Sequence, residues 1–332
     1  IKTPPASMTK IMTVYAAFDR LKNTDLSIEN ECVVSAKAYK MGGSRTFLEI
    51  DDKVSIDELL KGIIIQSGND ASVALAECLA GTEDDFAKLM NVYAKRLGMI
   101  NTNFLNSSGW PEDDHYSTVY DLALLSNALI REFPDLYLYF SDKEFTYNDI
   151  KQPNRNKLLS SVQGADGLKT GFTKASGWGI AATAKRDNNR RITTVINGTN
   201  SSRSRLNEAS NLINWAFSQT SQKLLVDENQ VIVQVDVWLG NKPRVNLVSS
   251  KKVVSTLSFD QIQLIKSSLQ YKRPIEAPIK KGEVYGKLII NIDGKPNIEV
   301  ELISQENIGT VNPISKVFAA MKYLIFGTSL DE

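Results

Sequence analysis

The sequence predicts a mixed α/β fold of the α+β class, in which an antiparallel sheet flanked by helices precedes a small all-β domain and a terminal amphipathic helix. Apolar residues recur at helical spacing through the first half of the chain, and three strand-like segments follow Gly164. From about Lys223 apolar and polar residues alternate, as they do in half-buried strands. We therefore expect a first domain at 1–222, a β-rich domain at 223–310 and a helix within 311–332.

The first helix is expected to start at the Pro4-Pro5 pair, because proline suits the first turn of a helix. Its apolar residues recur at helical spacing, at Met8, Ile11, Met12, Tyr15 and Phe18. This wide apolar stripe indicates a central helix. Ser7 and Lys10 lie three residues apart, so the lysine amine can reach the serine hydroxyl. A serine with a lysine as its base is a candidate nucleophile, although Ser-x-x-Lys also occurs by chance.

Further helical patterns complete the first half of the chain, at 55–65, 71–79, 86–97 and 121–131. The segment Ser67-Gly68-Asn69 separates the first two of these helices. Asp70 is placed to cap the second helix, and Thr82 with Asp85 forms an approximate capping box for the third.

The second half of the chain is richer in strands. Three strands and a helix are expected in the first domain, at 166–172, 178–186, 191–197 and 205–217 respectively. In the β-rich domain, alternate valines from Val231 to Val237 lie on one face of a strand. A hairpin is expected there between 287–292 and 298–302, across the turn Asp293-Gly294.

Composition and charge exclude several classes of function. The formal net charge is +1 and the basic residues are interspersed with acidic ones, so we expect no nucleic-acid partner. One histidine, His115, and two cysteines, Cys32 and Cys78, cannot supply a zinc motif, and we expect neither a metal nor another cofactor. Both cysteines are interpreted as small buried residues rather than as a disulfide, although their spacing is compatible with either redox compartment.

Three short motifs stand in chain order: Ser7-Met8-Thr9-Lys10, Ser67-Gly68-Asn69 and Lys169-Thr170-Gly171. Together they are far more specific than any one of them, since Ser-x-x-Lys, Ser-Asp-Asn and Lys-Thr-Gly form the signature set of penicillin-binding proteins and class A β-lactamases. In this chain the middle motif reads Ser-Gly-Asn. The set resembles the serine D-alanyl-D-alanine carboxypeptidases, the low-molecular-mass penicillin-binding proteins. The resemblance extends to the segments 66–71 and 166–171, the helix 205–215 and the β-rich tail, and it implies a β-lactamase/transpeptidase-like catalytic domain.

The resemblance assigns a chemical role to each motif residue. Ser7 would attack the carbonyl of the penultimate D-alanine, and a neutral Lys10 would take its proton. Burial and the nearby cation of Lys169 would lower the pKa of Lys10. Asn69 would hold Lys10 and the substrate amide, and Ser67 would pass a proton to the leaving amine.

The remaining site residues would stabilise negative charge on the substrate. Backbone N–H groups of Ser7 and Phe172 would stabilise the oxyanion. The terminal carboxylate would meet a cationic end of the pocket, formed by Lys169, Thr170, Gly171 and Arg205. Phe172 stands where several relatives carry a polar residue, so we expect altered preference or rate. Without the motif set, Ser67 would be interpreted as a helix cap, Asn69 as a turn residue and Arg205 as a solvated helix arginine.

His115 is the only histidine that could take the place of Lys10 as the catalytic base. It follows three acidic residues in Glu112-Asp113-Asp114, and no Gly-x-Ser-x-Gly motif accompanies it. We interpret it as a loop residue and not as a catalytic base.

The implied partners are a peptidoglycan stem peptide ending in D-Ala-D-Ala, β-lactam antibiotics, and a membrane surface bound by the C-terminal helix. That helix has apolar residues on one side from Ile314 to Ile325, and its alternative role is packing on its own domain. No stretch of 18 apolar residues is present. The resemblance implies a location at the periplasmic face of the bacterial inner membrane, a signal peptide already removed, and further strand-forming sequence ahead of Ser7.

Three other functions remain open at this point. A β-lactamase would need a glutamate-held water, but no Glu-x-x-Leu-Asn segment lies between Asn69 and Lys169, so penicillin is expected to acylate Ser7 and stay. Endopeptidase cleavage of cross-links uses the same groups. A non-catalytic peptidoglycan-binding scaffold would have no chemical need of the motif residues, all of which are present.

Overall fold

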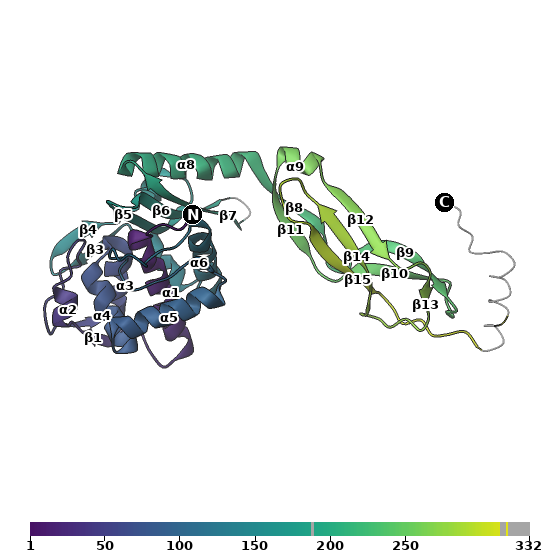
Figure 1. Cartoon of the computed structure of the whole chain (residues 1–332), viewed down its shortest axis with the longest axis horizontal. Helices are drawn as coiled ribbons and strands as arrows, with labels where there is room; N and C mark the ends of the chain where they lie inside the picture. The colour runs from purple at the N-terminus through teal and green to yellow at the C-terminus, as the bar shows by residue number, and fades with distance from the viewer. Residues whose placement is uncertain (187–188, 313–316, 318–332) are drawn as a thin grey trace. The chain divides into compact units, whose positions relative to one another are not determined.

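The computed structural model describes residues 1–186, 189–312 and 317. The chain divides into two compact units, Ile1–Ala216 and Phe217–Glu332. The first unit combines helices with sheets, and the second consists mainly of strands (Figure 1). This architecture confirms the predicted fold class.

The central sheet of the first unit has three antiparallel strands in the order β5-β6-β7. Their bounds are β5 (Ala165–Thr173), β6 (Gly177–Arg186) and β7 (Arg190–Thr199), close to the predicted segments. Helix α8 (Ser202–Gln219) covers one face of this sheet, and the helical half of the unit lies on the other (Figure 1).

The first helix is the centre of the helical half, as predicted. A 3₁₀ turn, η1 (Ala6–Thr9), leads into α1 (Lys10–Asn23), and every residue from Lys10 to Phe18 is buried. A helix buried on all sides for more than two turns belongs to the core of a domain. The turn that carries Ser7 is therefore attached to a helix of the domain core.

Other helices and short strands surround α1. The helices are α2 (Ala36–Tyr39), α3 (Ile56–Lys61), α4 (Asn69–Ala80), α5 (Glu83–Arg96), α6 (Val119–Glu132), α7 (Leu158–Ser161), a π-turn η2 (Gly62–Gln66) and a 3₁₀ segment η3 (Leu136–Ser141). Two antiparallel strand pairs complete the unit: β1 (Glu31–Val33) with β2 (Lys53–Ser55), and β3 (Glu144–Tyr147) with β4 (Ile150–Pro153). The capping box predicted near α5 is confirmed in part, since the Thr82 side chain accepts from the Asp85 N–H.

The predicted capping role of Asp70 is wrong. Helix α4 begins at Asn69 with Gly68 at its N-cap, which has no side chain to cap with. The Asp70 carboxylate, fully buried, instead accepts hydrogen bonds from the backbone N–H groups of Thr46, Phe47 and Leu48 at 2.8–3.3 Å. Because a buried carboxylate is costly without partners, it is satisfied by a loop that is distant in sequence.

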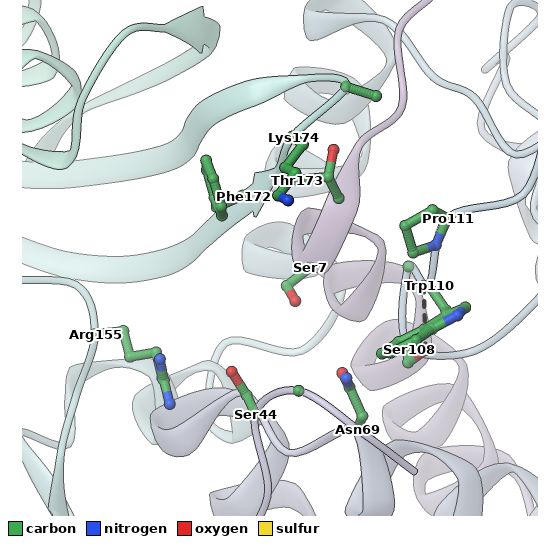
Figure 2. A pocket seen from close by; sticks show the side chains of 13 residues that line it. Ser7, Ser44, Asn69, Ser108, Trp110, Pro111, Arg155, Phe172, Thr173 and Lys174 are labelled. Carbon is green, nitrogen blue, oxygen red and sulfur yellow. Dashed lines mark hydrogen bonds between the residues drawn. The ribbon is translucent and has the colours of Figure 1, made fainter.

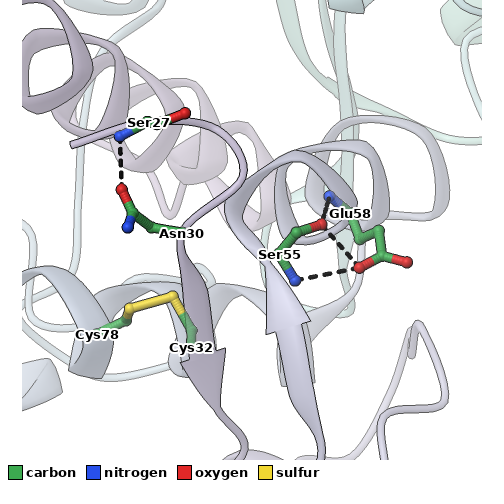
Figure 3. Close-up of a disulfide and its surroundings, with 6 residues drawn as sticks. All are labelled: Ser27, Asn30, Cys32, Ser55, Glu58 and Cys78. Atoms are coloured by element: carbon green, nitrogen blue, oxygen red, sulfur yellow. Dashed lines mark hydrogen bonds between the residues drawn. A yellow bond between two sulfur atoms is a disulfide. The ribbon is translucent and has the colours of Figure 1, made fainter.

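The interpretation of the two cysteines as free thiols is also wrong. Cys32 in β1 and Cys78 in α4 form a disulfide with an S–S length of 2.07 Å (Figure 3). Their sulfurs meet because β1 packs directly on α4, a contact between elements 46 residues apart that the spacing alone could not reveal. The bridge ties the short β1–β2 pair to the helix that starts at Asn69.

The second unit is built from a six-stranded sheet in the order β12-β14-β15-β10-β9-β13, and a separate pair, β8 with β11. Within this unit the strands are β8 (Thr220–Val226), β9 (Val231–Trp238), β10 (Arg244–Ser249), β11 (Val253–Ser258), β12 (Lys266–Tyr271), β13 (Ile275–Glu276), β14 (Val284–Asn291) and β15 (Ile298–Ser304). A short helix, α9 (Phe259–Gln263), lies between β11 and β12 in the chain. The predicted hairpin is confirmed, since Leu288 pairs with Val300.

The predicted terminal helix lies largely outside the described residues, which end at 312 apart from 317. Within the described ranges, no helix has both the length and the apolar character needed to cross a bilayer.

Candidate active site

The turn that carries Ser7 has an unusual backbone. Ala6 has a positive φ of 50°, a conformation that costs free energy for a residue with a Cβ, and the Met8 N–H then closes the turn on the Pro5 carbonyl at 3.1 Å. Gly109, at φ 79°, lies against this turn so closely that a Cβ there would stand 1.9 Å from the Ala6 carbonyl oxygen. The backbone of the 105–110 loop therefore packs directly on the Ser7 turn.

Lys10 lies beneath this turn with no exposed surface. Its Nζ is 3.2 Å from Ser7 Oγ, 2.7 Å from Asn69 Oδ1 and 2.6 Å from the Ser108 carbonyl oxygen. A neutral amine has two N–H donors and one lone pair. In this neutral form the amide and carbonyl oxygens accept the two N–H groups and the lone pair is left for the Ser7 hydroxyl, whereas in the charged form the third N–H donates to Ser7 Oγ.

The surroundings of Lys10 favour this neutral form. Burial is the main cause that lowers the pKa of Lys10, to about 7; the charge of Arg155 lowers it further, and Asp70 and Glu83 oppose the change. The expected contribution of burial is confirmed. The cation acting on Lys10 is Arg155, whereas the effect between the two lysines is found at Lys169, whose pKa is lowered by burial first and then by Lys10.

The middle motif is presented by a π-turn. Residues Gly62–Gln66 form the π-turn η2, Ser67 follows in the left-handed region at φ 63°, and Asn69 begins α4. The Asn69 side chain is buried, and its Nδ2 donates to the Gly42 carbonyl at 2.7 Å while its Oδ1 accepts from Lys10. Asn69 is therefore locked in one orientation.

Ser67 is 3% exposed and is the residue that ends the π-turn, not an N-cap. In the part of the chain that the structure describes, its hydroxyl is not hydrogen-bonded to Ser7 or Lys10. The structure thus joins Ser7, Lys10 and Asn69 by hydrogen bonds and leaves Ser67 outside that network.

The third motif lies on β5, beside the Ser7 turn. Lys169 and Thr170 are buried, and Lys169 Nζ donates to the Thr170 carbonyl at 3.4 Å. A Cβ at Gly171 would lie 2.9 Å from the Pro5 carbonyl oxygen, so only glycine lets the strand approach the turn this closely. The next residue, Phe172, is 47% exposed and its ring lies against that of Trp178, with centroids 4.2 Å apart and the planes tilted by 31°.

Arg205 reaches the same strand from α8. Its Nη1 is 3.4 Å from the carbonyl oxygens of Gly171 and of Gly179, and its guanidinium lies 5.3 Å from the Trp178 ring. Burial lowers its pKa to about 10, and the side chain is only 5% exposed. The burial of Arg205 rules out the alternative of a solvated helix arginine, which would apply without the motif set.

A cavity of about 680 Å³, within the range of small-molecule sites, lies beside the Ser7 turn. Of the predicted site residues, Ser7, Asn69 and Phe172 line it, and Lys10, Ser67, Lys169, Thr170, Gly171 and Arg205 are not among its lining residues. Ser7 opens into it, with Arg155 on one side of Ser7 and Trp110 on the other (Figure 2). Two cations, Arg155 and Lys174, are among the lining residues that the structure describes, and no acidic side chain is. A cavity of this kind favours an anionic ligand.

Three participants were not predicted from the sequence. Arg155 is held by its Nε, which donates to the Gln66 carbonyl at 2.8 Å, and it stands in a loop with no motif. The Ser108 acceptor is a backbone group, which has no sequence signal. His115 was expected to be a loop residue, and it is one, but it is 2% exposed and 2.9 Å from Thr9 in the Ser7 turn.

No cluster of three or more histidine, cysteine, aspartate or glutamate side chains that could hold a metal occurs among residues 1–186, 189–312 and 317. The groups of the site that can carry out chemistry are a hydroxyl paired with a buried amine, next to a strand edge and several cations. Such an arrangement suits nucleophilic attack on a carbonyl by an activated serine.

Comparison with known proteins gives matches over both units. Residues 1–200 match the peptidase S11 family, described as D-alanyl-D-alanine carboxypeptidase, and residues 221–310 match the penicillin-binding protein 5 C-terminal domain. The D-alanyl-D-alanine carboxypeptidase DacC of Escherichia coli K12 is 38% identical, over 97% of this chain and 83% of the relative. DacF of Bacillus subtilis 168 is 34% identical, over 91% of this chain and 79% of the relative.

Solved structures agree with this. Penicillin binding protein 5 from Haemophilus influenzae superposes with a TM-score of 0.81 at 32% identity, covering 93% of this chain and 91% of that one. Penicillin-Binding Protein D2 from Listeria monocytogenes, solved with ampicillin bound, is 31% identical with a TM-score of 0.60, over 65% of this chain and 88% of that one. The chain therefore belongs to the peptidase S11 family of D-alanyl-D-alanine carboxypeptidases.

Proposed function

We propose that this protein is a serine D-Ala-D-Ala carboxypeptidase that removes the terminal D-alanine from peptidoglycan stem pentapeptides. The observation that carries the proposal is the fully buried amine of Lys10, whose two N–H groups have fixed acceptors and whose third position faces Ser7 Oγ at 3.2 Å. Family membership supports it.

In the acylation step, Ser7 Oγ attacks the carbonyl carbon of the penultimate D-alanine, and its proton passes to Lys10 Nζ. The backbone N–H groups of Ser7 and Phe172 stabilise the oxyanion that forms. The C–N bond then breaks, the departing amine takes a proton that Ser67 relays, and D-alanine leaves. Water hydrolyses the ester on Ser7 and restores the free enzyme.

The terminal carboxylate of the substrate binds beside the cavity, along β5, where Lys169, Thr170, Gly171 and Arg205 are the proposed contacts; the residues that line the cavity on this strand are their neighbours Phe172 and Thr173. Support comes from the convergence of two buried cations: the pKa of Lys169 is lowered by burial and, among other cations, by Arg205. A carboxylate placed there would neutralise a charge cluster that costs free energy in the free protein. Asn69, fixed by Gly42 and Lys10, is positioned to hold the substrate amide.

β-Lactams are proposed to acylate Ser7 and to leave slowly. The Listeria relative was solved with ampicillin bound. A fast β-lactamase needs a carboxylate near the ester to activate water. The described lining of the cavity has cations, Arg155 and Lys174, and no carboxylate, so a long-lived acyl-enzyme is expected here.

We further propose 1–222 as the catalytic domain, 223–310 as a β-rich domain, and 311–332 as an amphipathic helix that binds the periplasmic face of the bacterial inner membrane. The apolar stripe from Ile314 to Ile325 in the sequence supports the last assignment. Deleting residues 313–332 should abolish cosedimentation with anionic lipid vesicles and leave D-alanine release unchanged. Equal vesicle binding by both forms would contradict it.

The direct test of the proposed function is D-alanine release from a peptide ending in D-Ala-D-Ala. Ser7→Ala is expected to abolish release, and Ser44→Ala, a serine lining the same cavity, should retain it within about threefold. Release by Ser7→Ala at the wild-type rate would refute the proposal.

A further inference from the structure

His115 is a buried titratable group that the proposed reaction does not use. It is the only histidine in the chain and is 2% exposed. Its Nδ1 accepts a hydrogen bond from the Leu105 backbone N–H at 3.2 Å, and its Nε2 lies 2.9 Å from Thr9 Oγ1. Because a backbone N–H can only donate, Nδ1 carries the lone pair and the proton is on Nε2, which donates to Thr9.

These two hydrogen bonds join two segments of the active site. Thr9 is the last residue of the turn that carries Ser7, and Lys10 follows it directly. Leu105 begins the 105–110 loop, in which the Ser108 carbonyl accepts from Lys10 Nζ at 2.6 Å. The imidazole thus connects the turn of the nucleophile to the loop that supplies an acceptor for its base.

The other contacts of this loop hold it from a different side. The Ser107 N–H and hydroxyl donate to Glu83 at 3.0 and 2.7 Å, and Thr13 Oγ1 donates to the Ser107 carbonyl at 2.6 Å. None of these three hydrogen bonds involves the turn at residues 6–9. Among the described side chains, the catalytic candidate Lys10 bonds to Ser7 in that turn and to the loop, and His115 is a second side chain that bonds to both.

The surroundings keep His115 neutral over the pH range in which Lys10 titrates. Burial lowers the pKa of His115 to about 4; the charge of Glu83 opposes this and that of Lys10 adds to it. A protonated imidazole would also place an N–H against the Leu105 N–H. The bridge is therefore unchanged while Lys10 gains or loses its proton near pH 7.

We propose that His115 is a positioning residue for acylation: its neutral imidazole fixes Thr9, and through it Ser7 and Lys10, against the Ser108 carbonyl. The inference rests on the proposed function of Ser7 and Lys10. It predicts that loss of the imidazole slows the chemical step and leaves ligand binding nearly unchanged, because no ligand contact is removed.

Two substitutions separate this role from simple packing. His115→Leu fills the site but cannot bond to either partner. His115→Gln offers an amide oxygen for the Leu105 N–H and an amide N–H for Thr9. Ser126→Ala is the matched control, because it removes a buried hydrogen bond, from Ser126 Oγ to the Leu122 carbonyl at 2.7 Å, within α6.

Stopped-flow acylation by benzylpenicillin should give a rate constant about 10- to 100-fold lower for His115→Leu, with the dissociation constant of the initial complex within about threefold of wild type. For His115→Gln and Ser126→Ala, both the acylation rate constant and the dissociation constant should stay within about threefold of the wild-type values. Melting temperatures are measured for each. Wild-type acylation by His115→Leu, or an equal loss in Ser126→Ala, would overturn the inference.

NMR of the tag-free protein provides an arm that does not depend on activity. The single imidazole should show an unprotonated Nδ1 and a protonated Nε2, without titration between pH 5.5 and 9. A proton on Nδ1, or titration near the ordinary histidine value of about 6.5, would overturn the inference. If wild type is not acylated at all while the tautomer is as expected, the proposed function fails and the positioning role falls with it.

Discussion

The protonation state of Lys10 follows from what surrounds its amine. Full burial penalises the charged form, and the two oxygens at 2.6 and 2.7 Å are satisfied by the two N–H groups of the neutral form. With a pKa of about 7, the amine is poised to act as a base near neutral pH.

Acylation should therefore depend on pH through Lys10. The neutral fraction of the amine increases as pH rises through its lowered pKa. The acylation rate is therefore expected to be half-maximal near pH 7 and to decrease further at lower pH. Lys10→Arg, which keeps a proton at every accessible pH, should lose about 10²- to 10⁴-fold. A rate independent of pH between 5 and 9 would contradict the assignment of Lys10 as the base.

The sequence was sufficient to predict the catalytic groups that belong to motifs. The structure brings Ser7, Lys10 and Asn69 into one hydrogen-bonded network, as the motif set predicted they would meet. The sequence could not predict the role of Ser108, because Ser108 acts through its backbone carbonyl and every residue has one. The burial of His115 also escaped the sequence, because its acidic neighbours suggested an exposed loop.

Short elements depend on contacts that are remote in the chain. Asp70 stood where a helix cap is expected, but its carboxylate is used by the loop at 46–48. The π-turn before Ser67 has no sequence signature, and it arises where Gly62 packs against Thr46 with no room for a Cβ, which would be 2.4 Å from Thr46 Oγ1. Local pattern predicted that helices exist, and tertiary packing set how they end.

The disulfide should stabilise the region where β1 meets α4. Closing a loop of 46 residues is worth about 2–4 kcal/mol, so the double variant Cys32→Ala, Cys78→Ala should unfold at a lower denaturant concentration by a comparable free energy. Dithiothreitol should reduce wild type to the same stability and leave the variant unaffected. Two free thiols in the unreduced, denatured wild type would contradict the bridge.

Helix α8 contributes to the site through Arg205, whose buried guanidinium is the proposed anchor of the free carboxylate. Arg205→Ala is expected to raise KM about 10- to 100-fold for a peptide ending in a free D-alanine carboxylate, since a charge-assisted contact is lost. A peptide with an amidated C-terminus should be affected far less. Arg203→Ala, an exposed arginine on the same helix, is the control. Equal effects on the acid and the amide would contradict this role.

For the whole molecule, the order of helical and strand patterns predicted the fold class. The three strands after Gly164 pair as one antiparallel sheet, and the alternation after Lys223 forms the β-rich unit. The pattern was less informative about burial on individual strand faces: Val235 is buried, but Val231, on the same predicted face, is 49% exposed. Which end of a strand is covered depends on its neighbours in the sheet, and sequence alternation does not specify them.

Ser7, activated by Lys10, is the residue that we propose to be acylated. The most direct measurement is mass spectrometry of the intact protein after mixing with benzylpenicillin, followed by peptide mapping of the adduct. We predict one adduct of the mass of penicillin, located on Ser7, persistent over minutes, and absent from Ser7→Ala. An adduct on another residue, or none on a protein that still releases D-alanine, would contradict the account.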